Sequence, residues 1–273
     1  MVRTMLVLLS FMLIITSAFA LIEANPLSVN TSDPDRMPWL CEGTLYFVTH
    51  SYNIYQAEWN DGNCGEAEPV KGPINTSQNE ISPCVIRNNN GELVMYFGRY
   101  TGSERDYDFF RSVFDEEKGE WGEPETVYEL STETQDWRIW VNNDETKAYV
   151  TTKGSFGGVD PIGGRDVWYA EKKDGKWTTP TNVEEVNSSG NEWSVFVDPE
   201  GKIWFDSARD DSIGGYDIYF YNPKTGEIGH PEMKINTFYH ERSMWTDGNI
   251  IIFTTADRTD GSGSYDLYLA ELE

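Results

Sequence analysis

The chain has 273 residues, of which 46 are acidic and 21 are Lys or Arg, so its formal net charge is −25. This excess of carboxylates argues against nucleic acid and anionic membrane surfaces as partners, because both require clustered basic residues. With three cysteines, Cys41, Cys64 and Cys84, at least one is left unpaired if only internal disulfides form, which excludes a disulfide scaffold.

The first 20 residues have the pattern of a secretory signal peptide. Arg3 is followed by an apolar run over residues 5–15 and by the small-residue site Ala18-Phe19-Ala20. The run is shorter than the roughly 20 apolar residues that a membrane span needs. We therefore expect cleavage after Ala20, no membrane span in the mature chain, and a secreted or periplasmic location.

From residue 30 onward a unit of about 50 residues recurs five times. Each copy starts with a small polar residue that is followed five positions later by a carboxylate. The copies are NTSDPD (Asn30, Asp35), NTSQNE (Asn75, Glu80), STETQD (Ser131, Asp136), NSSGNE (Asn187, Glu192) and NTFYHE (Asn236, Glu241).

Each carboxylate is followed by a β-rich run, a turn, a second strand, and a third strand with an aromatic ending such as YDIY. A fourth strand ends in Pro and a β-branched residue. Four antiparallel strands per unit predict an all-β fold, a five-bladed β-propeller that occupies residues 21–273 as one domain, expected to be a monomer.

The two ends of the repeat array complement each other. The fifth unit stops after its third strand at YDLYLAELE, whereas ANPLSVN near the start resembles the end of a fourth strand. We therefore expect residues 24–30 to form the outermost strand of the last blade and to close the ring.

The stretch NEWSVFVDPEGKIWFDSAR, followed by GGYDIYFYN, resembles the TolB-type (WD40-like) propeller repeat, which is common in exported bacterial proteins. The resemblance extends over nearly all of the mature chain and is strongest over residues 164–222. It implies the propeller fold but selects no function, because this repeat occurs in binding modules, peptidase-associated domains and lyases.

The repeated acidic residues have a structural interpretation. Each blade places a basic residue at the end of its second strand, on the same face as its carboxylate; these are His50, Arg99, Lys153, Arg209 and Arg258. Pairing within a blade is expected, most clearly for Glu80 with Arg99, Glu192 with Arg209 and Glu241 with Arg258. The third-strand aspartates Asp108, Asp166, Asp217 and Asp266 are expected to fix loop backbone.

Two Asp- and Gly-rich loops, RDDSIGGYD and DRTDGSGSYD, suggest calcium as a possible cofactor. Several carboxylates on a flexible backbone can wrap a hard cation. The candidate ligands are Asp210, Asp211, Asp257 and Asp260. Ordinary solvated turns explain the same composition, because neither loop has the ordered spacing of an EF-hand.

Binding residues are expected where the blades differ. The position after each carboxylate is Arg36, Ile81, Trp137, Trp193 and Arg242. Ring closure would place Arg36 beside Arg242, while Trp137 and Trp193 would form an aromatic wall; inter-blade packing and surface salt bridges are the alternative explanations. With Glu80, Asp136 and Glu192 they are the candidate ligand-binding residues.

The leading hypothesis is a propeller that binds a carbohydrate, acidic or neutral, at this face, since aromatic rings stack on sugars and paired arginines hold a carboxylate. The alternative is an enzyme. A glycoside hydrolase would use Asp35 as base and Glu241 as acid, whereas a polysaccharide lyase would use His240 or His50 as base. A platform for an envelope protein is the third hypothesis.

Overall fold

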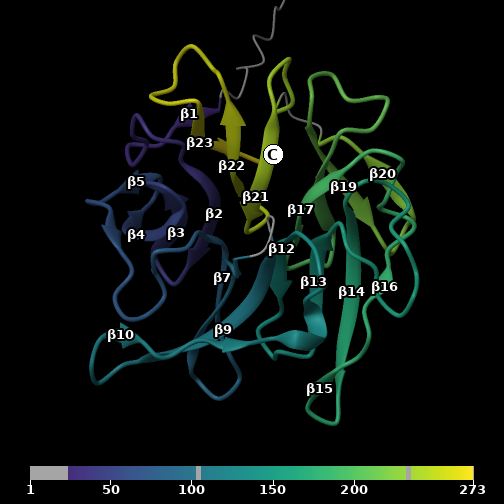
Figure 1. Ribbon diagram of the computed structural model, residues 1–273. Helices are drawn as coiled ribbons and strands as arrows, with labels where there is room; N and C mark the ends of the chain where they lie inside the picture. Colours follow the sequence, from purple (N-terminus) through teal and green to yellow (C-terminus); the bar gives the residue numbers. More distant parts are fainter. Residues whose placement is uncertain (1–23, 103–105, 232–234, 273) are drawn as a thin grey trace, which may run out of the picture.

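The computed structural model describes residues 24–102, 106–231 and 235–272, so the predicted signal peptide lies outside the described residues. Five antiparallel sheets surround one axis, as Figure 1 shows. A single 3-10 turn, Tyr128–Leu130, is the one helical element in the described ranges. The all-β, five-bladed propeller expected from the repeat is thereby confirmed.

Each blade contributes one strand to each ring of the propeller. The innermost strands are β2 (Arg36–Cys41), β7 (Glu80–Arg87), β12 (Asp136–Val141), β17 (Glu192–Val197) and β21 (Glu241–Thr246). The second strands are β3 (Thr44–Thr49), β8 (Leu93–Tyr100), β13 (Lys147–Thr152), β18 (Ile203–Ser207) and β22 (Ile250–Ala256). The third strands are β4 (Asn53–Asn60), β9 (Tyr107–Asp115), β14 (Asp166–Lys173), β19 (Asp217–Asn222) and β23 (Tyr265–Glu271).

The fourth strands are short, and in three blades they are split in two. The split pairs are β5 (Asn63–Cys64) with β6 (Glu68–Pro69), β10 (Glu120–Trp121) with β11 (Glu125–Thr126), and β15 (Lys176–Trp177) with β16 (Thr181–Asn182). The fourth blade has one piece, β20 (Glu227–Gly229). Each short piece pairs with the third strand of its own blade.

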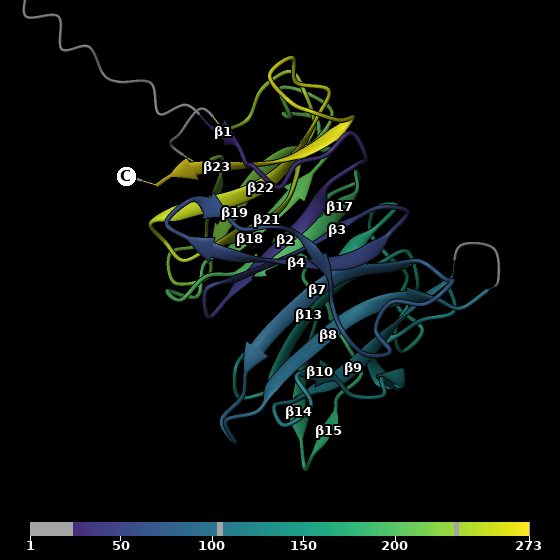
Figure 2. The ribbon, with the colours of Figure 1, turned by 90° about the vertical axis from the view of Figure 1, so that its left-hand side faces the viewer.

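The N-terminal segment closes the last blade, as expected. Strand β1 (Asn25–Pro26) pairs antiparallel with β23, and the two lie side by side in Figures 1 and 2. The Leu27 amide donates to the Leu267 carbonyl at 2.9 Å, and the Leu27 and Val29 side chains are buried. Only Asn25 and Pro26 form regular β-pairs with β23, but residues 24–30 as a whole complete the last blade.

The blades are held together by apolar packing between their innermost strands. Trp39 is buried, and its indole donates to the Val85 carbonyl of the next blade at 2.6 Å. All three cysteines are free, so Cys41 and Cys84, on neighbouring innermost strands, form no disulfide. The Cys64 side chain is half-buried against the core. Over the described ranges, no helix has the length and apolarity needed to cross a membrane.

Candidate functional site

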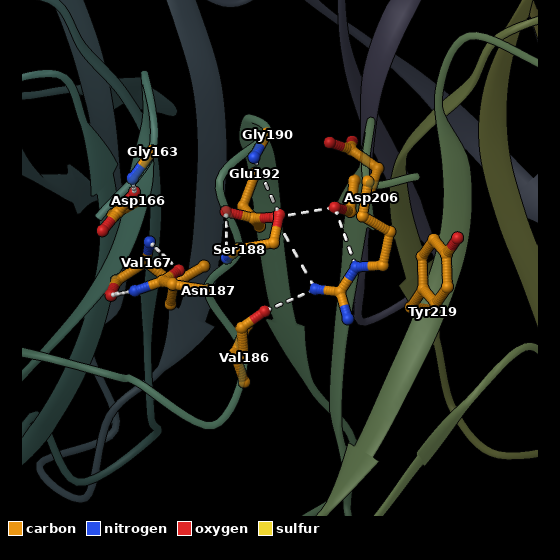
Figure 3. Close-up of polar contacts among 12 residues, drawn as sticks. Gly163, Asp166, Val167, Val186, Asn187, Ser188, Gly190, Glu192, Asp206 and Tyr219 are labelled. Carbon is orange, nitrogen blue, oxygen red and sulfur yellow. Dashed lines mark hydrogen bonds and ion pairs between the residues drawn. The ribbon is translucent and has the colours of Figure 1, made fainter. Parts of the chain in front are cut away.

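The Asn that starts each repeat clamps neighbouring blades together. Its side-chain amide accepts from the backbone N–H, and donates to the C=O, of one residue in the third strand of the preceding blade. For Asn187 this residue is Val167, with distances of 2.7 and 2.8 Å (Figure 3). The other amide clamps join Asn30 to Leu267, Asn75 to Ile54 and Asn236 to Ile218. Ser131 accepts from Phe109 in the remaining blade.

The five repeated carboxylates are fully buried and serve the local turn. Glu192 accepts from the Ser188 hydroxyl at 2.7 Å (Figure 3). It also accepts from the Ser207 hydroxyl at 2.6 Å. The same contact to a Thr or Ser four residues earlier recurs at Asp35, Glu80, Asp136 and Glu241. Burial raises the pKa of the Glu192 carboxyl. These side chains therefore hold the entry to each innermost strand and do not reach solvent.

Two of the expected ion pairs within blades form. Glu80 lies 3.0 Å from Arg99, and Glu192 lies 3.6 Å from Arg209. The expected pair of Glu241 with Arg258 is wrong, because Arg258 turns into its own loop and pairs with Asp260 at 3.2 Å.

The fully buried Asp35 was likewise expected to pair with the base of its own blade, His50. That pairing is also wrong, because His50 is exposed and contacts Asp33 at 2.7 Å. A surface carboxylate is within its reach, whereas Asp35 already accepts from Thr31.

The third-strand aspartates bind loop backbone, as expected for a structural role. Asp166 accepts from the Ile162 amide at 2.6 Å. It also accepts from the Gly163 amide at 3.0 Å (Figure 3). Asp217 and Asp266 make the equivalent contacts in their own loops.

The four candidate calcium ligands do not converge. Asp211 accepts from the Tyr219 hydroxyl and Asp260 from the Tyr268 hydroxyl, each within its own blade. Across the described part of the chain, no three His, Cys, Asp or Glu side chains are grouped as a metal site would require. Asp210 and Asp257 are exposed at the surface of separate loops.

A β-bulge follows the carboxylate in every innermost strand. The register shifts fall between Arg36 and Trp39, Ile81 and Cys84, Asp136 and Arg138, Glu192 and Val195, and Arg242 and Met244. A bulge re-aims the side chain beside it. In four blades the residue after the carboxylate lies at the mouth of the axial channel, whereas Ile81 of the second blade is fully buried.

Four of the variable residues predicted for ligand binding line one cavity of about 150 Å³ at this mouth. They are Arg36, Trp137, Trp193 and Arg242. The remaining lining residues are Met37, Tyr52, Ser243, Thr254 and Tyr265. This cavity, which we call the mouth pocket, is lined by two guanidinium groups and four aromatic rings, and no lining residue is a carboxylate.

The arginines of the mouth pocket lie against tyrosine rings. The Arg36 guanidinium is 4.8 Å from the ring centres of both Tyr52 and Tyr265, and it donates to the Tyr52 hydroxyl at 3.1 Å. The Arg242 guanidinium is 3.8 Å from the Tyr216 ring centre, within cation–π range. These ring contacts restrain both guanidinium groups before a ligand binds, so less side-chain entropy is lost on binding.

Arg165 completes this belt and was not among the residues selected from the sequence. It is fully buried, 5.4 Å from the Trp137 ring and 4.4 Å from the Trp193 ring. Trp137 and Trp193, the two residues expected to form an aromatic wall, touch each other edge to face with ring centres 5.0 Å apart. The residue before the third-strand Asp or Asn is Tyr in the other four blades, and Arg165 is the exception that could have been found.

Arginines without a carboxylate partner gather at the axis. Of the nine arginines in the described ranges, Arg87, Arg99, Arg111, Arg209 and Arg258 form ion pairs. The other four, Arg36, Arg138, Arg165 and Arg242, lie at the mouth or just below it. In a chain of net charge −25, this clustering gathers four guanidinium groups near the axis.

The candidate catalytic residues lie around the mouth pocket but outside its lining. His240 packs beside Tyr216, with ring centres 5.9 Å apart, and burial together with the nearby Arg242 lowers its pKa. Burial raises the pKa of Asp35 and of Glu241, which accept from Thr31 and Thr237. Their engagement in the turns does not favour the catalytic roles expected for them.

Comparisons with solved structures find other five-bladed propellers. The GH43 endo-arabinanase from Bacillus licheniformis has a TM-score of 0.53 at 12% identity, covering 90% of this chain and 96% of that one. The endo-arabinase from Bacteroides thetaiotaomicron has a TM-score of 0.57 at 11% identity, with 91% and 98% covered. The α-L-arabinanase from Penicillium chrysogenum, complexed with arabinobiose, has a TM-score of 0.51 at 9% identity, with 92% and 99% covered.

At these identities the likeness is one of fold. No protein-family model matches the sequence, and no curated protein is similar to it. The resemblance to the TolB-type repeat accordingly stays a prediction.

Proposed function

We propose that this protein is an exported propeller that acts on a carbohydrate, and that the mouth pocket binds an acidic sugar unit. The observation that carries the proposal is the lining of the pocket. Arg36 and Arg242, which have no carboxylate partner in the described ranges, line the same cavity as Trp137 and Trp193. Aromatic faces stack on sugar rings, and a guanidinium holds a carboxylate through paired hydrogen bonds.

The size of the pocket narrows the proposal to one end of a saccharide chain. Its volume of about 150 Å³ is below the roughly 300–1,000 Å³ of pockets that enclose drug-sized ligands. One terminal sugar ring with its carboxylate is therefore the unit that fits, with the rest of the chain lying outside the mouth.

The test is a titration of matched oligosaccharides that differ only in oxidation at C6, uronate against neutral hexose, followed by tryptophan fluorescence and calorimetry. Binding of the uronate form is expected, with an affinity that falls as salt is added. Arg242→Gln should weaken it about 10- to 100-fold, the value of a charge-assisted hydrogen bond. Arg87→Gln, in the Glu42 and Glu116 cluster away from the mouth, is the matched control.

Equal affinity of the two sugar forms would refute the acidic-sugar assignment. Absence of binding by every member of the panel, with folded protein, would refute carbohydrate recognition at this face. If no sugar binds but an envelope protein is recovered with the folded chain, the hypothesis of a protein-docking platform would be supported instead.

A second candidate, glycoside hydrolysis, is favoured by the named structural neighbours, which are arabinanases, over a purely binding role. Hydrolysis needs two carboxyl groups about 5–9.5 Å apart. Asp35 and Glu241 directly precede Arg36 and Arg242, and the raised pKa of Glu241 suits an acid, although both must leave their Thr partners to reach a substrate.

Mass spectrometry of products from arabinan, galactan and uronate polymers in ¹⁸O water tests the catalytic candidates. Incorporated ¹⁸O that is lost in Asp35→Asn and Glu241→Gln supports a hydrolase. An unsaturated product lost in His240→Ala supports a lyase, for which His240 with its lowered pKa would be the base. No product from any polymer supports binding alone.

A further inference from the structure

Arg138 occupies the axis of the propeller below the mouth pocket. It lies on β12, two residues after Asp136, and its side chain is fully buried. Its Nη2 atom lies 3.4 Å from the Pro38 carbonyl of the first blade and 3.5 Å from the Met244 carbonyl of the fifth. The side chain therefore crosses the channel from the third blade.

The sequence explains why a long side chain fits here. The corresponding positions of the other blades are Met37, Ser82, Ser194 and Ser243, so three serines leave space on the axis that one arginine fills. Met37 and Ser243 also line the mouth pocket, and they directly precede the residues whose carbonyls Arg138 approaches. The guanidinium thus lies immediately beneath that pocket.

The guanidinium is incompletely satisfied. Its Nε and Nη1 atoms are buried and have no hydrogen-bond partner in the described part of the protein, and no carboxylate there pairs with it. A buried cation that lacks a partner is strongly destabilising. The Trp39 ring, 5.8 Å away, offers only a weak cation–π contact.

No titratable neighbour in the described ranges forms a direct ion pair with Arg138, although the buried Asp206 interacts with it electrostatically. Asp206 is fully buried, and its two oxygens accept from the Trp193 and Ser194 amides, the Ser194 hydroxyl and the Ser243 amide. The Cys84 thiol has a pKa raised by burial to about 12 and is therefore uncharged at neutral pH. Arg165, which donates to Gln135, and Arg242 also form no ion pair in the described ranges, so guanidinium groups outnumber carboxylates at the axis.

We propose that the axial channel binds a small monovalent inorganic anion, of the halide class, at Nε and Nη1 of Arg138. Charge favours an anion over water, and full burial excludes the carboxylate of a saccharide. The bound ion would accept from the two nitrogens that the Nη2 contacts to the first and fifth blades leave without a partner. This site is independent of the saccharide proposal, because it lies below the pocket floor.

Crystals of the wild-type protein soaked in sodium bromide test the site directly. An anomalous peak within hydrogen-bonding distance of Nε and Nη1 of Arg138 is expected. Water at this position without anomalous signal, or bromide bound only elsewhere, would overturn the proposal. This measurement requires no variant.

Melting curves in sodium chloride and in sodium gluconate, at equal ionic strength, provide the solution test. Saturating chloride should raise the melting temperature of the wild type by roughly 5 °C over gluconate. Arg138→Gln should lose this difference, whereas the control Arg258→Gln, changed in an outer loop, should keep it. No chloride effect in the wild type, or an equal effect in Arg138→Gln, would contradict the assignment.

Discussion

Replacing Asn75 with Ala should lower the free energy of unfolding by about 2–4 kcal/mol. The amide of Asn75 accepts from the Ile54 amide and donates to the Ile54 carbonyl, both at 2.8 Å. Ile54 is fully buried, so in the variant its N–H would have neither the Asn75 side chain nor water as a partner. An unsatisfied buried N–H costs about 1–3 kcal/mol. Its carbonyl keeps the contact to the Val70 amide at 3.2 Å, so the second loss is worth only about 1 kcal/mol.

Urea denaturation followed by tryptophan fluorescence measures this change, with an unaltered slope expected because the exposed area on unfolding stays the same. Asn75→Asp, which retains the acceptor and loses the donor, should fall between Ala and wild type. Asn63→Ala is the matched control, since Asn63 is exposed and contacts only turn carbonyls at 3.3–3.4 Å. A loss for Asn75→Ala no larger than that of the control would refute the clamp as a stabilising element.

Three further predictions follow from the fold and its buried acids. Deleting residues 24–30 should cost several kcal/mol and promote association through the exposed edge of β23, as measured by melting and light scattering; unchanged melting would contradict closure. Burial raises the pKa of Asp136 to about 8 from its usual 3.8. The stability that protonated Asp136 contributes is therefore complete below about pH 4 and is lost as the pH rises toward 8. Asp136→Asn should make the free energy of unfolding depend less on pH between about 4 and 8. An unchanged slope of that free energy against pH would refute this. Calcium should leave the melting temperature unchanged, because Asp211 and Asp260 serve separate blades; a shift that Asp211→Asn abolishes would restore the calcium site.

The fold was predictable because the same kinds of polar residue recur at the same spacing at the start of each unit. The small polar residue that starts each unit, Asn in four units and Ser131 in the third, has to reach the preceding blade. The carboxylate five positions later has to hold the turn between them, so the two residue types recur at fixed spacing. Because both residues bind backbone groups at fixed positions, few other residue types can replace them, and the repeat is easily recognised in the sequence. The same reasoning gave the closing segment, since Asn30 makes with Leu267 the contact that Asn187 makes with Val167.

The partners of the long side chains were less predictable. Arg258 and His50 were assigned to the carboxylates of their own blades from strand register alone. Register fixes the face on which a strand ends, but the conformation of the following loop decides where a flexible side chain points. In the first blade, residues 50–52 all have positive φ, and this tight turn directs His50 toward Asp33.

Part of the site was predictable from the positions at which the five blades carry different residues. Comparing the position after each carboxylate identified Arg36, Trp137, Trp193 and Arg242, which the bulge brings to one mouth. Arg138 and Arg165 break the repeat at two other positions that were not compared. Their chemical role depends on the absence of a partner, which no linear pattern reveals.

The contact between Asn30 and Leu267 also bears on how the chain reaches its native state. These residues are 237 positions apart, so the ring can be sealed only after the final strand has been made. Before β23 has formed, residues 24–30 have no strand to pair with, and before they pair with β23 the last blade has an open edge. Non-local closure of this kind slows folding and prolongs exposure to aggregation. A circular permutant that moves the seam to the loop between two complete blades should refold faster than the natural order of strands.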